Sequence, residues 1–208
     1  VEQIVADFPP LTADDVLEVT GTGETVGSSY KPSTELGMHL FIYRQRPDIL
    51  AVVHAHPPYA TGFAAAGQGL EQCVFPEVIV GLGAVPLAVY ATPSTEEVAR
   101  SLAPFVEKTD AILLANHGMV AYGTSLWDAY YKLEKVEHAC HITLVARLLG
   151  GPKVLNSSDI EKLRAISQQS YGKEFTGKLA CEPREPVEPT HDAEEELREL
   201  VRRMIRGA

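Results

Sequence analysis

Three histidines stand where they could bind one metal ion. His54 and His56 lie one residue apart at the end of the apolar run 49–56. Because successive side chains of a strand point to opposite faces, both imidazoles are expected on the same face. Pro57 follows immediately. A proline cannot continue a central strand, so we expect the pair at a strand end.

His117 is the third candidate ligand. It follows a second apolar run, 111–115, and precedes Gly118, which permits a tight turn. Three neutral imidazoles suit zinc and leave a coordination position open for water or substrate. We therefore predict a divalent-metal site, with Zn²⁺ preferred and another divalent ion as the alternative. From the residues alone, a chance histidine pair and an ordinary hydrogen-bonded His117 are the competing interpretations.

Glu35 is the acidic residue that could act beside such a metal. It lies in the first turn of the helix expected after Pro32, where the helix dipole alone would favour a carboxylate. The functional alternative is a proton-transfer base next to the ion. His39 lies four residues further along the same face, and we expect it in the core or behind the metal ligands.

A second group of ionisable residues lies on the long helix expected at 126–149. We predict a solvated edge there in preference to a second metal site, because the group is mixed with apolar residues of the same helix. Its members are Glu134, Glu137, His138 and His141.

Strands and helices are needed to position these residues. The glycine-rich stretch 16–27 predicts a hairpin and not a dinucleotide-binding loop, because no helix opens directly after it. Further strands are expected at 49–56, 78–82, 85–89, 111–115 and 120–122. Helices are expected at 33–46, 58–66, 94–107, 126–149 and 158–171, with Ser33 or Thr34 capping the first. This mixture predicts an α/β sandwich with a largely antiparallel sheet.

Composition restricts the class of protein. The 208 residues suffice for one compact domain, and the formal net charge of −10 opposes binding to nucleic acid, though not to a small phosphorylated ligand. We see no secretory signal and no apolar run long enough to cross a membrane. The three cysteines, few and widely spaced, predict reduced thiols and hence a cytoplasmic location. They are Cys73, Cys140 and Cys181.

The C-terminal part of the chain has a different composition. Residues 173–190 are polar and contain three prolines, which predicts a linker. Residues 191–208 have the periodicity of an amphipathic helix. We expect its apolar face to pack on its own domain or on a neighbouring subunit.

Several motifs taken together resemble the class II aldolase/adducin family. The matching segments are PSTELGMH (32–39), RPDILAVVHAHPPYAT (46–61), VPLAVYATPST (85–95), AILLANHGMVAYG (111–123) and EHACHITLVARLLGG (137–151). The resemblance spans about residues 11–172, so we expect residues 1–172 to form one domain of this family. The family's N-terminal helix and Gly-Asn loop would precede Val1, so that part is expected to be missing or short.

The resemblance implies a three-layer α/β/α fold and a homotetramer with active sites between subunits. It implies that His54, His56 and His117 bind zinc. Glu35 matches the family's catalytic base, which can also touch the metal. Ser33 and Thr34 match hydroxyls that bind substrate phosphate. Tyr171 matches a catalytic tyrosine that follows the last helix in aldolases of the family.

The resemblance also implies a reaction. A zinc-dependent aldolase would cleave a ketose 1-phosphate, such as L-fuculose 1-phosphate, to dihydroxyacetone phosphate and an aldehyde. A sugar-phosphate 4-epimerase is one alternative, but such enzymes carry aspartate where Glu35 stands. A methylthioribulose-1-phosphate dehydratase is another. A non-catalytic adducin-like module is least favoured, because such modules lose the metal ligands.

Overall fold

The computed structural model describes residues 12–171 and Cys181. Its central sheet contains four strands: β3 (Ala51–Ala55), β4 (Leu87–Ala88), β5 (Ala111–Leu114) and β6 (Gly118–Gly123). Their order is β3-β6-β5-β4, and β6 runs antiparallel to both β3 and β5, whereas β4 runs parallel to β5. The sheet is therefore mixed and largely antiparallel, as predicted.

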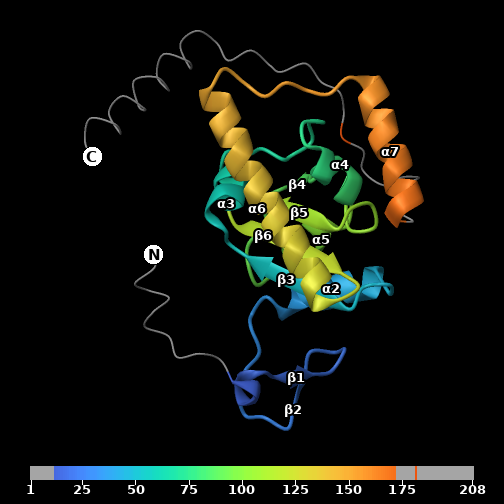
Figure 1. Cartoon of the computed structure of the whole chain (residues 1–208). Helices are drawn as coiled ribbons and strands as arrows, with labels where there is room; N and C mark the ends of the chain where they lie inside the picture. Colours follow the sequence, from blue (N-terminus) through green and yellow to red (C-terminus); the bar gives the residue numbers. More distant parts are fainter. Residues whose placement is uncertain (1–11, 172–180, 182–208) are drawn as a thin grey trace.

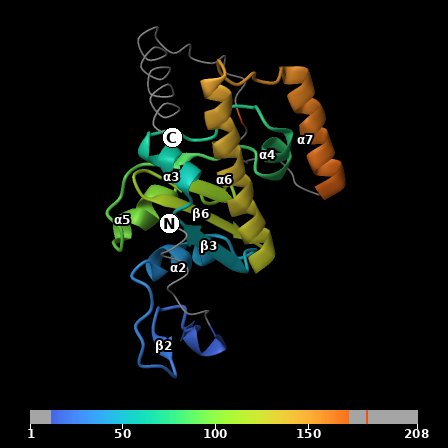
Figure 2. The ribbon, with the colours of Figure 1, turned by 60° about the vertical axis from the view of Figure 1, so that its left-hand side comes forward.

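Helices cover both faces of this sheet (Figures 1 and 2). On one face lie α3 (Pro58–Ala65) and α6 (Leu126–Leu148), and on the other lie α2 (Leu36–Gln45) and α5 (Glu96–Leu102). Alternate residues of the central strands pack against the two helix layers: Leu113 packs on the side of α3 and α6, and Ile112 on the side of α2 and α5. Strands buried on both faces read as continuous apolar runs. The predicted three-layer α/β/α arrangement is confirmed.

The N-terminal hairpin is also confirmed. After the short 3₁₀ helix η1 (Ala13–Asp15), strands β1 (Glu18–Val19) and β2 (Thr25–Val26) pair antiparallel. The turn between them contains Gly23 at φ +92°, a conformation that glycine adopts without steric cost.

One predicted strand is wrong. Residues 78–82 were expected to be extended because of their β-branched composition, but Pro76–Gly81 form the helix α4. Pro76 occupies the first turn, where its missing N–H costs nothing. Val78 and Ile79 are both buried, although they are adjacent. Burial on a helix therefore outweighed local strand propensity.

Helix α4 packs against α7 (Ser157–Tyr171), the last element that the structure describes.

Two expectations about where helices begin and end also change. Helix α5 ends at Leu102 and is followed by turns, not by further helix to residue 107. Helix α2 has Glu35 at its N-cap and no side-chain cap, so neither Ser33 nor Thr34 caps it.

The prediction of three reduced thiols is wrong for two of them. Cys73 and Cys181 form a disulfide with a Cα–Cα distance of 5.2 Å, and both are buried. They lie 108 residues apart, so their spacing in the sequence gave no indication of the pairing. Cys140 is free and buried, and burial raises the pKa of its thiol to about 12.

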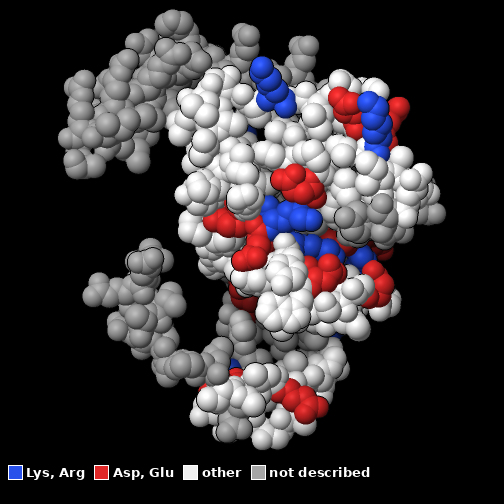
Figure 3. Space-filling model, viewed as in Figure 1, with Lys and Arg blue, Asp and Glu red and all other residues white. Residues whose placement is uncertain are grey.

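The expected linker (173–190) and C-terminal helix (191–208) lie outside the described residues, apart from Cys181. Within the described part of the chain, no helix has the length and apolarity needed to cross a membrane. The face shown in Figure 3 carries basic side chains interspersed with acidic ones, and no extended basic surface.

Candidate metal centre

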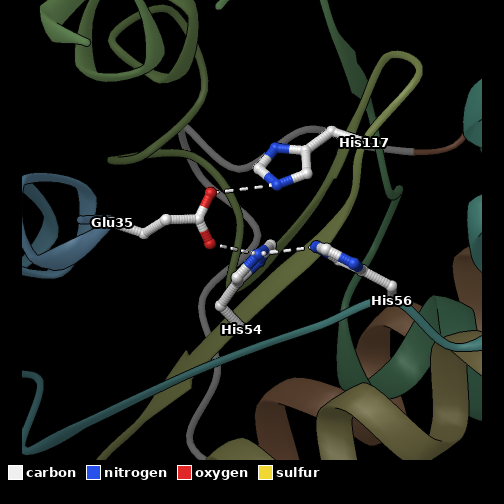
Figure 4. Close-up of side chains that lie close together, drawn as sticks. All are labelled: Glu35, His54, His56 and His117. Atoms are coloured by element: carbon white, nitrogen blue, oxygen red, sulfur yellow. Dashed lines mark hydrogen bonds and ion pairs between the residues drawn. The ribbon is translucent and has the colours of Figure 1, made fainter. Parts of the chain in front are cut away.

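The sheet topology brings the carboxyl ends of three strands to the same end of the sheet. Strands β3 and β5 both run antiparallel to β6, and β4 runs parallel to β5. Strands β3, β4 and β5 therefore share one direction, and their carboxyl ends lie at the same end of the sheet. The histidine pair lies at the end of β3, and His117 lies in the turn between β5 and β6. Glu35 reaches this end of the sheet from the start of α2 (Figure 4).

The four side chains converge on one point. Glu35 Oε2 lies 2.8 Å from His54 Nε2, and Glu35 Oε1 lies 3.0 Å from His117 Nε2. His56 Nε2 lies 3.1 Å from His54 Nε2. One ligand atom from each of the four residues lies within 4.8 Å of those of the others. The imidazole ring centroids are 4.9 Å apart in every pair, so the rings form an even triangle.

The hydrogen bonding of His54 determines which nitrogen faces this point. His54 Nδ1 lies 2.9 Å from the carbonyl oxygen of Met119. A carbonyl oxygen can only accept, so Nδ1 carries the hydrogen and Nε2 keeps its lone pair. Burial lowers the pKa of His54, although Glu35 opposes this effect. The neutral form, which is the form that binds metals, is therefore favoured.

The donor set fits a divalent cation. A carboxylate and a second imidazole nitrogen face the lone pair of His54 at 2.8 and 3.1 Å. Where these facing atoms all carry lone pairs, the arrangement is repulsive unless a cation or a shared proton lies between them. Three imidazoles and one carboxylate are ligands that zinc accepts. The structure thus brings together every residue that the sequence suggested as a metal ligand.

The turn that carries His117 depends on two unusual backbone positions. Asn116 has φ +55°, a left-handed conformation that asparagine tolerates better than most residues. At Gly118, a Cβ atom would lie 2.7 Å from the carbonyl oxygen of Ala55 and would collide with the His56 ring. Only glycine permits this approach without displacing His56, so the glycine contributes to the metal centre by its lack of a side chain.

Glu137 supports the site in a way that the sequence did not indicate. Its carboxylate accepts hydrogen bonds from the backbone N–H groups of Tyr59 (3.0 Å) and Ala60 (2.7 Å). It thereby caps α3, the helix that begins directly after the histidine pair. The prediction of a solvated edge is wrong for Glu137, which is half-buried, and is confirmed for its exposed neighbours, Glu134, His138 and His141.

The residues expected to bind phosphate lie beside the metal centre. Ser33 Oγ accepts a hydrogen bond from Glu35 N at 3.2 Å and lines a cavity of about 520 Å³ between the hairpin and α2, together with His39. Thr34 and Glu35 line a second cavity, of about 430 Å³, between α2 and α5. The two neighbouring hydroxyls therefore face different cavities.

His39 is set apart from the four converging side chains. Burial lowers the pKa of its imidazole, and Glu35 opposes the shift. Tyr171 ends α7, but its side chain lies outside the described part of the structure, so its catalytic role stays a prediction.

Comparisons with known proteins agree with this geometry. Residues 1–144 match the family described as Class II Aldolase and Adducin N-terminal domain. A 5-deoxy-D-ribulose 1-phosphate aldolase of Bacillus thuringiensis serovar kurstaki is 34% identical over 161 residues, which are 77% of this chain and 75% of that protein. A 3-oxo-tetronate 4-phosphate decarboxylase of Escherichia coli (strain K12) is 34% identical over 155 residues, 71% of each chain.

A solved structure of an L-fuculose 1-phosphate aldolase is similar in fold. Its TM-score is 0.69 at 33% sequence identity, and the match covers 78% of this chain and 74% of that one. The chain therefore belongs to the class II aldolase and adducin family. Within that family it is a metal-dependent lyase, as the enzyme names of its relatives and its own Glu/His₃ group indicate.

Proposed function

We propose that this chain is a zinc-dependent aldolase that cleaves a ketose 1-phosphate to dihydroxyacetone phosphate and an aldehyde. The convergence of Glu35 with His54 and His117, at 2.8 and 3.0 Å, carries the proposal. It places a carboxylate directly beside the point on which the imidazoles converge, where a base for this reaction is needed. The similarity to aldolases that act on sugar phosphates supports the substrate class.

The chain's own residues would divide the reaction between them. Cleavage breaks the bond between C3 and C4 of the ketose, and the C4 hydroxyl loses its proton as the aldehyde forms. The bonding electrons pass to an enediolate, and Glu35, in its carboxylic acid form, delivers its proton to C3 and takes a replacement from solvent. Tyr171, as its phenolate, is proposed to accept the hydroxyl proton and to release it to solvent. A bound divalent cation would supply Lewis-acid stabilisation of the enediolate charge.

Substrate phosphate is proposed to bind at Ser33 and Thr34. Each hydroxyl oxygen already accepts one hydrogen bond, Ser33 from Glu35 N and Thr34 from Ser94. Each therefore keeps its own hydrogen available for an anionic oxygen. Because the two hydroxyls line different cavities, a phosphate that contacts both would have to lie at the start of α2, between these cavities.

A sugar-phosphate decarboxylase is the second candidate. Its supporting observation is the 34% identity to a 3-oxo-tetronate 4-phosphate decarboxylase. Loss of CO₂ from a 3-oxo acid that carries a 2-hydroxyl group, as a 3-oxo-tetronate does, also leaves an enediolate, so the same metal ligands would serve. The products separate the two reactions, because an aldolase releases an aldehyde and a decarboxylase releases CO₂.

The test uses a half-reaction that requires no aldehyde. The zinc-loaded protein is assayed against a panel of ketose phosphates for release of dihydroxyacetone phosphate, and then for exchange of that product's C3 proton with solvent deuterium. We expect Glu35→Gln to bind zinc and to slow exchange by about 10²–10⁴-fold. Glu24→Gln, an exposed glutamate of the hairpin, is the control and should exchange normally. Unchanged exchange in zinc-loaded Glu35→Gln would remove Glu35 from the mechanism.

We also propose a homotetramer. Helix α6 begins with exposed aromatic side chains: Trp127 is 65% exposed and Tyr131 58% exposed, and their rings stack at 5.8 Å. Exposed aromatic residues of this kind are typical of subunit interfaces. Light scattering should give four times the mass of the chain, and a monomer at micromolar concentration would contradict the proposal. A cytoplasmic location is likewise proposed; it rests on the similarity to a sugar-phosphate aldolase, because the Cys73–Cys181 disulfide removes the argument from reduced thiols.

A further inference from the structure

Ser94 has a backbone conformation that its residue type does not favour. Its φ is +66°, in the left-handed region that side chains with a Cβ rarely adopt. Within the described residues, the only other non-glycine residue at positive φ is Asn116, in the turn that holds His117. Ser94 follows β4, whose carboxyl end lies at the same end of the sheet as the metal centre. Unfavourable backbone conformations gather at functional sites.

Helix capping does not explain the hydroxyl of Ser94. The helix expected at 94–107 would begin at Ser94, but the structure has Thr95 at the N-cap of α5. Thr95 Oγ1 accepts the hydrogen bond from Glu97 N at 3.2 Å. Ser94 Oγ instead donates to Thr34 Oγ1 at 2.7 Å, across 60 residues of sequence. The hydroxyl thus serves a contact with the residue that precedes Glu35.

This contact has a chemical consequence for Thr34. A hydroxyl group has one hydrogen to donate and two lone pairs to accept with. Because one lone pair of Thr34 accepts from Ser94, the rotation of the Thr34 hydroxyl is restricted and its hydrogen remains available to another acceptor. That hydrogen can be directed only away from Ser94.

The cavity beside this pair suits an anion. It is about 430 Å³ in volume and is lined by Thr34, Glu35, Ser94, Arg44 and Arg100, among others. Arg44 donates through Nη2 to the carbonyl oxygen of Gly21 at 2.7 Å, which uses one of its five N–H groups. Arg100 pairs with Glu96 at 3.3 Å. The two guanidinium groups offset the two carboxylates of the lining, Glu35 and Glu96, so no net negative charge excludes a phosphate, and guanidinium N–H groups can donate to its oxygens.

We propose that Ser94 is a positioning residue for substrate phosphate, acting by holding the Thr34 hydroxyl as a donor. The inference rests on the proposed function, in which Thr34 binds the phosphate. It adds that the loop after β4 takes part in substrate recognition, and that Ser94 occupies a left-handed position in order to deliver its hydroxyl to Thr34.

Ser94→Gly separates this role from a structural one, because the two predict different results. Glycine adopts φ +66° freely, so the melting temperature should stay the same or rise. Removal of the Ser94 hydroxyl should weaken the Kd for inorganic phosphate, measured by calorimetry on zinc-loaded protein, by up to about tenfold, since that is roughly the effect of losing the whole hydrogen bond from Thr34 to the charged phosphate. In the deuterium-exchange assay, KM for dihydroxyacetone phosphate should rise by a similar factor with kcat unchanged. A merely structural serine would, when removed, lower the melting temperature and leave Kd and KM as they are.

Two further variants test the route through Thr34. In a Thr34→Val background, Ser94→Gly should cause no additional loss of phosphate affinity, because the hydroxyl that it positions is gone. Ser94→Asn should restore part of the affinity, since asparagine tolerates the left-handed region and its amide can donate to Thr34.

The outcomes distinguish this inference from the proposed function. Wild-type phosphate affinity in Ser94→Gly, additive losses in the double variant, or no phosphate binding by the wild-type protein would each overturn the role of Ser94. Absence of deuterium exchange in the wild-type protein, with the phosphate results as expected, would overturn the aldolase proposal and support the role of Ser94.

Discussion

The two ends of the parallel strands carry two very different groups of ionisable residues. At the amino ends, Asp110 lies 3.1 Å from Arg46 and 3.0 Å from Lys132, and Lys132 also lies 2.9 Å from Asp128. At the carboxyl ends, the Glu35 carboxylate faces imidazole nitrogens, and burial favours the neutral form of His54. At the amino ends, side chains of opposite charge compensate one another. At the carboxyl ends, the side chains instead offer lone pairs that can bind a cation.

Burial makes this difference informative. The side chains of Lys132 and Asp110 are only 8% and 7% exposed, so each requires its partner to offset the cost of leaving water. Lys132 additionally donates to the carbonyl oxygen of Tyr122 at 3.0 Å. The amino-end cluster therefore serves the folded state, and the carboxyl-end cluster is arranged to bind a cation. A cluster of buried ionisable groups therefore indicates a functional site only where its charges are not compensated within the cluster.

The largest expected effect is at the amino ends. Lys132→Met removes a cation from a buried network and should lower the free energy of unfolding by about 3 kcal/mol, because it leaves carboxylates less compensated. Lys162→Met, which breaks an exposed pair with Asp159, is the matched control and should change it little. Urea denaturation compares the two. Equal stabilities of these variants would show that the amino-end cluster does not serve the folded state.

A smaller effect, which separates the two clusters more clearly, is expected from glycine substitutions at the two ends of β6. Gly118→Ala places a Cβ against His56, and Gly123→Ala places one against Asp128 and 2.9 Å from Ala129 N. We expect the first substitution to lower metal affinity by about 10–100-fold, as displacement of groups that orient metal ligands does. The second should lower the free energy of unfolding by about 1–3 kcal/mol through overpacking and leave metal affinity unchanged.

Metal titration of both variants tests whether Gly118→Ala lowers metal affinity and Gly123→Ala does not. Urea denaturation tests the loss in free energy of unfolding expected for Gly123→Ala. Gly62→Ala is the control, since a Cβ there meets nothing within 4 Å and alanine favours the helix. Similar effects of Gly118→Ala and Gly123→Ala on metal affinity would contradict the division between the two ends.

Much of the site was predictable from local rules. The side-chain period of a strand placed His54 and His56 on one face, and Pro57 marked the strand end. The third ligand, His117, needed the topology or the family's motifs, because no local rule relates residues so distant in sequence. The first-turn position of Glu35 was consistent both with a helix-dipole role and with a place beside the metal, and only the fold distinguished them.

Other features had no local signal. Glu137 reads as one more polar residue on α6, yet it caps α3 behind the histidine pair. Ser94 reads as a helix cap, and its contact with Thr34 depends on the packing of α2 against α5. The strand expected at 78–82 is a helix because burial against α6 and α7 outweighs the propensity of its β-branched residues.

Metal content tests the central claim most directly. Purified wild-type protein should contain about one zinc ion per chain by elemental analysis, and X-ray absorption should give nitrogen and oxygen ligands at about 2.0–2.1 Å. The double variant His54→Ala plus His56→Ala should remain folded and contain almost no zinc, because two of the four converging ligands are gone. Full zinc occupancy in that double variant would contradict the assignment of the carboxyl-end cluster as the metal centre.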